Sequence, residues 1–182
     1  MKRVDLNRYS SKDYKPGGLI KRIFWYIINS VIFKSTFPYP LSLKIFFLRL
    51  FGAKIGNGVI IKPEIDIKYP WFLEIGNYTW IGQGAHIDNL VLVKIGNNVC
   101  VSQGAAIFTG NHNYKLESFD LVTKAVIIED GVWLGAKSIV CLGVIIKEHS
   151  VVTVGSVVTH DMEAYKIYQG NPAKAIRNRI IE

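Results

Sequence analysis

The sequence predicts a mainly β protein: a parallel β-helix of about five coils, with a helical N-terminal extension and a short C-terminal helix. Two observations predict this fold. Aliphatic residues recur every six positions from residue 55 onward, and glycine or asparagine recurs four positions into many of these hexads. The expected organisation is an extension over residues 1–54, a β-helix over 55–163 with a protruding loop at about 109–125, and a tail over 164–182.

The six-residue repeat defines the sides of the coils. Its first positions are all isoleucine, leucine or valine: Ile55, Ile61, Ile67, Ile75, Ile81, Ile87, Ile95, Val101, Ile107, Ile128, Leu134, Val140, Ile146, Val152 and Val158. A period of six fits neither an amphipathic helix nor a long strand, but it fits a solenoid whose triangular coil has three short sides. We therefore expect these residues to point inward, with a coil period of twenty early in the chain and eighteen later.

The expected corners carry residues that tolerate a positive φ. They are Gly58, Gly84, Asn98, Gly104, Gly110, Gly131, Gly143 and Gly155. Glycine lacks a Cβ, and asparagine enters the left-handed region more readily than most other residues, so both suit a tight corner. Stacked coils would then pair at the usual strand spacing of about 4.8 Å.

The N-terminal extension is strongly basic. Residues 1–54 contain eleven lysines and arginines against two aspartates, in a chain of net charge +8. This asymmetry predicts an anionic partner near the extension. No nucleic-acid-binding motif accompanies the charge, so we do not expect nucleic acid to be that partner.

The apolar run IFWYIINSVIF, residues 23–33, has three interpretations. The first is a helix packed on the β-helix. The second is an interfacial helix through which residues 18–35 contact a membrane. The third is a spanning helix, but the run falls far short of the roughly 20 apolar residues that a spanning helix requires. Residues 18–50 are expected to cap the first coil, and the tail to cap the last, because the ends of a β-helix leave unpaired strand edges.

The chain has only two cysteines, Cys100 and Cys141, which give no disulfide framework, so we expect a cytoplasmic protein. If residues 18–35 form an interfacial helix, we expect the protein at the inner face of the cytoplasmic membrane as a peripheral protein.

The repeat breaks once, after Ile107, and resumes at Ile128. Long excursions from a compact solenoid usually carry function. The break begins with TGNH, which places His112 at its root, and histidine is the side chain best suited to proton transfer near neutral pH. The alternative is a loop that only shapes the packing of subunits, with His112 in solvent.

Several motifs together resemble the hexapeptide-repeat acyltransferases over residues 55–182. They are IGNGVI, IGNYTW, IGQGAH, IGNNVC, VSQGAA, IEDGVW, LGAKSI, VTVGSV and GNPAKAIR. The resemblance implies a left-handed β-helix, a handedness that the period does not show and that the general crossover rule would oppose. FGAKIG, HIDNL and VSQGAAIFTGNHNY are most similar to the colanic-acid and exopolysaccharide O-acetyltransferases, which are related to the galactoside and maltose O-acetyltransferases.

The resemblance implies an acetyl-CoA-dependent O-acetyltransferase that needs no metal. It would act on a sugar hydroxyl of a surface or exopolysaccharide precursor, lipid-linked or nucleotide-linked, with His112 as general base in direct transfer. The residues expected at the acceptor are Asp88, Asn89, Asn111, Tyr114 and Trp133. In this family the active site lies between neighbouring subunits, so a homotrimer is implied.

The same resemblance implies which residues bind acetyl-CoA. They are Ala136, Val154, Thr159, His160, Lys174 and Arg177. The two cations suit phosphate oxygens. Many relatives have lysine at the position of His160, so this chain departs from the family pattern there.

Three other functions remain open from the sequence. One is O-acetyl transfer to another small acceptor, such as a free sugar or serine. The second is a metal enzyme of the γ-carbonic anhydrase kind, which requires three zinc-bound histidines that the spacing of His86 and His112 does not reproduce well. The third is a β-helix that serves as a scaffold without catalysis.

Overall fold

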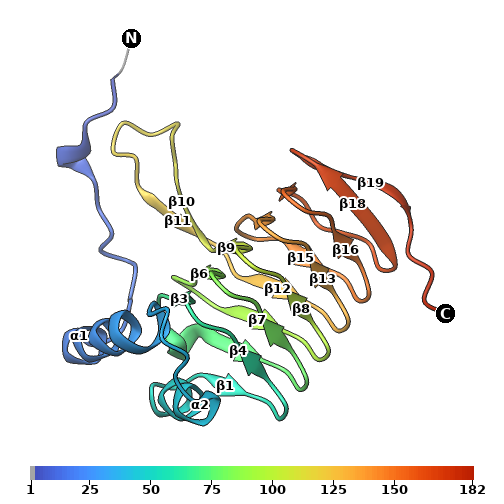
Figure 1. Cartoon of the computed structure of the whole chain (residues 1–182). Coiled ribbons are helices and arrows are strands. Elements are labelled where there is room, and N and C mark those ends of the chain that lie inside the picture. Colours follow the sequence, from blue (N-terminus) through green and yellow to red (C-terminus); the bar gives the residue numbers. More distant parts are fainter. Residues whose placement is uncertain (1–2) are drawn as a thin grey trace.

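The chain winds into stacked three-sided coils, seen here in a computed structural model that describes residues 3–182 (Figure 1). Each coil contributes one short strand to each of three sheets. Within the described residues there are five complete coils, and the bridge between Ile146 and Met162 begins a sixth. The β-helix expected from the six-residue repeat is therefore confirmed.

The three sheets run along the stack of coils. The first contains β1 (Lys54–Ile55), β4 (Leu73–Ile75), β7 (Val93–Ile95), β12 (Val126–Ile128) and β15 (Ile145–Ile146). The second contains β2 (Ile60–Ile61), β5 (Trp80–Ile81), β8 (Cys100–Val101), β13 (Trp133–Leu134), β16 (Val151–Val152), β18 (Lys166–Gly170) and β19 (Ala173–Asn178). The third contains β3 (Asp66–Ile67), β6 (His86–Asp88), β9 (Ala106–Phe108), β14 (Ile139–Val140) and β17 (Val157–Val158). A separate hairpin of β10 (Gly110–His112) and β11 (Leu121–Thr123) leaves the stack between β9 and β12.

The core is a column of aliphatic side chains. All fifteen first positions of the repeat are buried, with exposed fractions of 8% or less. They pair in register from coil to coil, as in the row Ile67, Ile87, Ile107, Val140 and Val158 of the third sheet. Burial of each such side chain contributes about 1.5–3 kcal/mol, so the repeat is the main source of stability.

The corners adopt the expected left-handed backbone with one exception. Seven predicted positions have φ between 54° and 77°: Gly58, Gly84, Asn98, Gly104, Gly131, Gly143 and Gly155. Gly110 does not, because the chain leaves the coil there and enters β10, so that prediction is wrong. A Cβ at Gly110 would lie 2.4 Å from Leu90 Cδ1, so close approach is the reason for glycine at this position.

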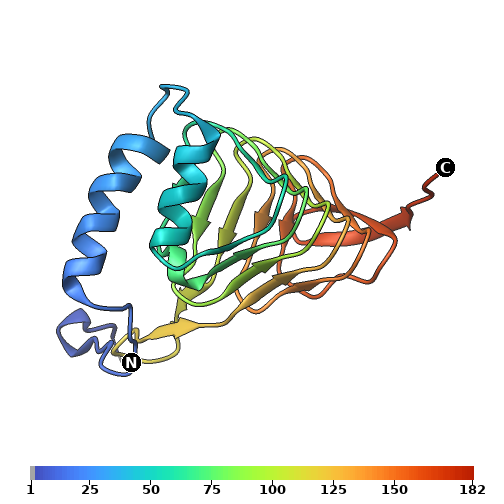
Figure 2. The same ribbon diagram turned by 90° about the horizontal axis from the view of Figure 1, so that it is seen from below.

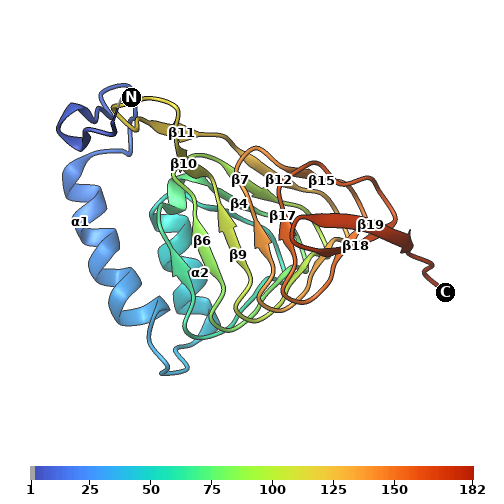
Figure 3. The ribbon, with the colours of Figure 1, turned by 90° about the horizontal axis from the view of Figure 1, so that it is seen from above.

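Helices cover the open end of the first coil (Figures 2 and 3). Two short 3-10 turns, η1 (Leu6–Arg8) and η3 (Pro70–Phe72), precede and follow them in the sequence. The covering elements are α1 (Leu19–Ile28), its π-helical continuation η2 (Asn29–Phe33), and α2 (Leu41–Leu50). Trp25, Phe33 and Leu48 are buried against the coil, which confirms that residues 18–50 cap it. None of the helices in residues 3–182 has the length and hydropathy required to cross a bilayer.

These helices supply hydrogen-bond donors to the unpaired edge of the first coil. On the three sides in turn, Arg49 Nη2 donates to the Ile55 carbonyl (2.8 Å), Lys44 Nζ to the Lys62 carbonyl (3.0 Å) and Trp25 Nε1 to the Ile67 carbonyl (2.8 Å). An exposed strand edge favours pairing with other chains, and a buried carbonyl without a donor costs free energy. The caps therefore end the sheet ladders within the molecule.

The tail differs from the prediction. We expected a helix from about Ala173, but β18 and β19 form an antiparallel hairpin that extends the second sheet. β18 pairs with β16 through Ile167 and Tyr168, and the chain reverses after Gly170, whose φ is 104°. Five registered pairs with β18 then hold the tail extended, so tertiary pairing overrides the helix propensity of this segment.

We expect Lys44→Met to destabilise the protein. Lys44 is 1% exposed and burial lowers the pKa of its ammonium group, yet its donors satisfy carbonyls that would otherwise lack a partner. The free energy of unfolding, measured with urea, should fall by about 1–3 kcal/mol. Exposed Lys62→Met is the control and should change it little. A gain of stability in Lys44→Met would mean that the buried charge costs more than its hydrogen bonds contribute.

Candidate active site

The hairpin of β10 and β11 is anchored at its root by Thr109. This residue is completely buried, and its hydroxyl donates to the Asp88 carbonyl at 3.0 Å. The same oxygen accepts from the Val91 N–H at 3.3 Å. These hydrogen bonds to the preceding coil therefore fix the point where the chain leaves the stack, three residues before His112.

The imidazole of His112 is held by two contacts. Its Nδ1 lies 2.9 Å from the carbonyl oxygen of Phe119, and its ring stacks on the Phe119 ring with centroids 4.5 Å apart and an interplanar angle of 8°. A carbonyl oxygen only accepts hydrogen bonds, so Nδ1 must carry the proton in the neutral ring. This leaves the lone pair on Nε2, the atom that can accept a proton from a substrate.

Phe119 presents its carbonyl from a strained backbone. Its φ is 51°, in the left-handed region, which is unusual for a bulky side chain. Such a conformation costs about 1–3 kcal/mol and concentrates at functional sites. Here it directs the carbonyl toward His112.

The N-terminal segment lies beside this hairpin (Figure 3). The Asp5 N–H donates to the Glu117 carbonyl at 2.8 Å, the Ser10 N–H donates to Asp120 Oδ1 at 3.3 Å, and Arg8 forms an ion pair with Glu117. Between these contacts, the ring of Tyr9 lies 5.9 Å from that of His112. The segment therefore forms a wall beside the histidine.

His112 faces a cavity of about 550 Å³, which we call the histidine cavity. Its lining includes Tyr9, Ser11, Tyr14, Asp88 and Asn111. Tyr14 donates its hydroxyl to the Leu90 carbonyl at 2.9 Å, and burial raises the pKa of this phenol, so it stays protonated. A polar cavity beside an oriented imidazole can hold a hydroxyl compound and remove its proton.

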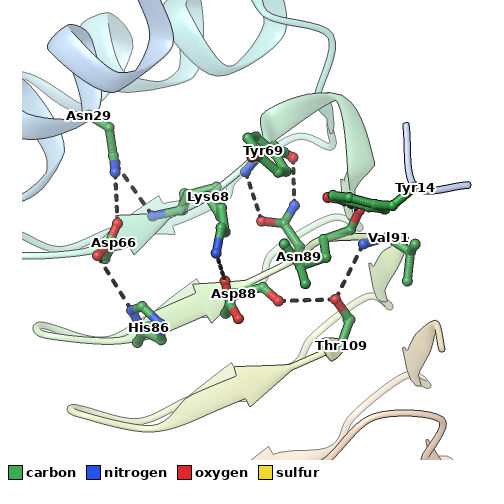
Figure 4. A network of polar contacts seen from close by, with 12 residues as sticks. Tyr14, Asn29, Asp66, Lys68, Tyr69, His86, Asp88, Asn89, Val91 and Thr109 are labelled. Atoms are coloured by element: carbon green, nitrogen blue, oxygen red, sulfur yellow. Dashed lines mark hydrogen bonds and ion pairs between the residues drawn. The ribbon is translucent and has the colours of Figure 1, made fainter. Parts of the chain in front are cut away.

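A polar network continues from this cavity toward α1 (Figure 4). Lys68 forms a 2.9 Å ion pair with Asp88. Beyond it, Asp66 faces His86 Nδ1 at 3.5 Å, Lys34 Nζ at 2.9 Å and Asn29 Nδ2 at 2.7 Å. Hydrogen bonds from His86, and then from Lys34 and Asn29, hold the pKa of Asp66 well below its usual range.

The structure separates the residues expected at the acceptor. Asp88 and Asn111 line the histidine cavity together with His112. Asn89 is completely buried, and its amide accepts from the Tyr69 N–H at 3.0 Å and donates to the Tyr69 carbonyl at 2.6 Å. Asn89 therefore bridges to Tyr69 and has no exposed surface in this chain for an acceptor to contact. Tyr114 is 74% exposed beyond the cavity.

The other expected site residues lie on different parts of the stack. Trp133, 48% exposed, lies on β13 in the second sheet and donates its indole N–H to Ser102 at 2.9 Å. Within the described residues of one chain it does not line the histidine cavity.

The residues expected at acetyl-CoA lie in three places on the stack. The Ala136 carbonyl accepts from the Gly155 N–H at 2.9 Å, which brings Ala136 and Val154 to one corner, and the Gly170 N–H donates to the Ser156 hydroxyl there. Lys174 follows on β19, whereas Arg177 lies three residues farther along that strand. Thr159 and His160 contact each other at 2.8 Å beyond β17, at a separate corner.

Several residues of the site were missed in the sequence. The pairs Asp66 and His86, and Lys68 and Asp88, are twenty residues apart, so the early coil period was a signal that could have placed them side by side. Tyr9, Phe119 and Arg22, which also lines the histidine cavity, carry no such signal, because their positions depend on long-range packing. Residues 3–182 contain no group of three or more histidine, cysteine, aspartate or glutamate side chains arranged to hold a metal ion.

Comparison with known proteins identifies relatives along nearly the whole chain. The Escherichia coli (strain K12) protein WcaF, whose name assigns it as a colanic acid biosynthesis acetyltransferase, is 34% identical over 177 residues, 97% of each chain. Galactoside O-acetyltransferase of the same organism is 24% identical, over 80% of this chain and 73% of that protein. No protein-family model matches the chain.

Solved structures share the fold. A hexapeptide-repeat acetyltransferase of Vibrio cholerae, crystallised with acetyl coenzyme A, superposes with a TM-score of 0.81 at 22% identity, covering 89% of this chain and 88% of that one. The left-handed β-helix implied by the sequence motifs is thus confirmed.

We expect the Asp66 network to make stability depend on pH. Because the folded-state pKa of Asp66 is depressed, its stabilisation is complete above the unfolded-state pKa of about 3.9 and is lost as the pH falls below that value. Asp66→Asn should lower the free energy of unfolding by about 2 kcal/mol at pH 7. The difference in the free energy of unfolding between the variant and the unmodified protein should become smaller below about pH 4. Urea unfolding at each pH would measure it. Exposed Asp13→Asn is the control, and a difference that stays constant with pH would refute the assignment.

Proposed function

Because the chain belongs to the hexapeptide-repeat acyltransferases, among the colanic acid biosynthesis acetyltransferases, we propose that it transfers the acetyl group of acetyl-CoA to a sugar hydroxyl. The acceptor is a precursor of a surface or exopolysaccharide. Acetyl-CoA as donor is supported by the structural relatives solved with acetyl-CoA or coenzyme A. The observation that carries the proposal within this chain is the orientation of His112, with Nδ1 on a carbonyl and Nε2 available.

The reaction follows from that orientation. His112 Nε2 accepts the hydroxyl proton as the acceptor oxygen attacks the thioester carbonyl. Collapse of the tetrahedral intermediate breaks the carbon–sulfur bond, and the coenzyme A thiolate leaves with the proton that His112 returns. The Phe119 carbonyl stabilises the transient imidazolium and keeps the ring in place, so no covalent acetyl-enzyme is required.

The proposed active unit is a homotrimer. Within one chain, the histidine cavity and the corners that carry Trp133, Ala136 and Val154 lie on different parts of the coil. A neighbouring copy would bring its own corner residues to the histidine cavity, so donor and acceptor would meet between subunits. Lys174 would remain available to a phosphate of the coenzyme, since it is exposed on β19.

A membrane surface is the proposed location. A stripe that we call the outer face of α1 contains Ile20, Phe24 and Ile27 of α1 and Val31 of its continuation η2, and each is more than half exposed. Their helical spacing puts them on one side, opposite buried Trp25 and Asn29, and the extension around them is basic. An apolar stripe flanked by cations suits the headgroup region of an anionic bilayer.

We expect His112→Asn to lose most of its acetyl transfer. Loss of a general base costs about 10²–10⁴-fold in kcat, whereas the KM for acetyl-CoA should change little. Release of the coenzyme A thiol, with methyl glycosides as surrogate acceptors, measures both constants.

His149→Asn is a matched control, because His149 is a corner residue with φ of 53° that asparagine tolerates. Retention of normal kcat in His112→Asn would exclude His112 as the general base.

In size-exclusion chromatography, the active enzyme should elute with three times the mass of the 20.5 kDa chain. Full activity in a monomeric peak would exclude the shared site.

The outer face of α1 should govern binding to anionic vesicles. The double variant Phe24→Ser/Ile27→Ser removes two apolar side chains worth about 1.5–3 kcal/mol each when buried. Co-sedimentation with phosphatidylglycerol vesicles at low salt should therefore fall by more than tenfold. Ile180→Ser/Ile181→Ser, also exposed and aliphatic, should bind normally. If vesicle binding is unchanged while the oligomer dissociates in the first variant, the face joins copies of this chain and the membrane proposal fails.

A further inference from the structure

A second cavity adjoins the histidine cavity. It measures about 640 Å³ and lies between α1 and the third sheet, and we call it the helix cavity. Four residues line both cavities: Arg22, Lys68, Tyr69 and Asp88. The two cavities therefore meet at these side chains, which we call the junction.

The junction carries a cation, Arg22, that forms no ion pair with any of the described residues. Arg22 Nε is buried, and no atom of the described residues accepts a hydrogen bond from it. None of the ion pairs among residues 3–182 includes Arg22, whereas Lys68 is paired with Asp88 at 2.9 Å. A desolvated guanidinium donor costs free energy until an anion binds it, and phosphate oxygens match the planar donors of arginine.

The two cavities differ in chemistry on either side of the junction. The histidine cavity has hydroxyl and amide groups from Tyr9, Ser11 and Asn111. The exposed wall of the helix cavity is formed by Leu19, Ile23 and Tyr26 of α1.

The opposite wall of the helix cavity carries charges that neutralise one another. Asp66 is hydrogen-bonded to Lys34 and Asn29 and faces His86. Asp88, at the junction, is the carboxylate already paired with Lys68. Among the described residues of the junction, Arg22 is therefore the cation that forms no ion pair. A ligand that spans both cavities would be polar, then anionic, then apolar.

We propose that the acceptor is a glycosyl phospholipid and that Arg22 binds its phosphate. The sugar then lies against His112, and the apolar chain lies against Leu19 and Ile23. This inference rests on the proposed function for the identity of the sugar site. The phosphate site can be tested without acetyl transfer.

Farnesyl diphosphate, below its micelle concentration and without acetyl-CoA, is the main probe. It should bind more tightly than either inorganic pyrophosphate or farnesol, measured by titration calorimetry. Arg22→Gln should weaken farnesyl diphosphate and pyrophosphate by about tenfold to a hundredfold, and should leave farnesol unchanged. Ile23→Gln should weaken farnesyl diphosphate and farnesol but leave pyrophosphate unchanged.

Matched variants separate this site from general charge and from catalysis. Lys94→Gln removes an exposed cation from the first sheet and should bind farnesyl diphosphate normally, and Arg22→Lys should bind with intermediate affinity. His112→Asn should also bind normally, so a failure of catalysis and a failure of this site are distinguishable. Unchanged binding in Arg22→Gln would overturn the phosphate site. UDP-glucose binding as tightly as farnesyl diphosphate would overturn the lipid acceptor in favour of a nucleotide-linked one.

Discussion

The unpaired edge of the first coil is the constraint on which the rest of the structure depends. The strands of the middle coils are hydrogen-bonded on both sides by their neighbours, whereas β1, β2 and β3 begin the three sheets and have a strand partner on one side only. Arg49, Lys44 and Trp25 supply donors from outside the repeat. This arrangement holds Lys44 almost completely out of water, and burial lowers the pKa of its ammonium group. The alternative is an open ladder that can recruit another chain.

The cap also builds the ligand-binding side of the molecule. Trp25 bonds to the Ile67 carbonyl, and Asn29, one turn later, bonds to Asp66 and to the Ile67 N–H. These contacts fix the rotation of α1 against the third sheet. Arg22, one turn before Trp25, then lines both cavities, and the stripe of apolar residues on the opposite side faces outward. Capping and recognition are thus performed by neighbouring residues of one helix.

The hairpin that carries His112 uses regularity and irregularity together. Its root is fixed by Thr109, whose hydroxyl forms hydrogen bonds with the backbone of Asp88 and Val91 in the preceding coil. The loop between β10 and β11 holds Phe119 in a left-handed conformation, so that a main-chain carbonyl sets the tautomer of the imidazole. A carbonyl cannot change its protonation state, which makes it a reliable partner for a group that must gain and lose a proton in each cycle. The N-terminal segment completes the wall through contacts with Glu117 and Asp120.

The sequence alone determined the parts of this protein that repeat. The period of six placed the fifteen buried first positions of the repeat, and the break after Ile107 located the histidine, because both are consequences of chain-local spacing. Tertiary structure decided which side chains meet. Asn89 became a buried bridge to Tyr69 because the coil turns it inward, and the tail became a hairpin because β18 offered paired hydrogen bonds that outweigh helix propensity. Arg22 reaches the junction only because α1 packs on the open edge of the first coil, a contact between segments about forty residues apart that no local pattern encodes.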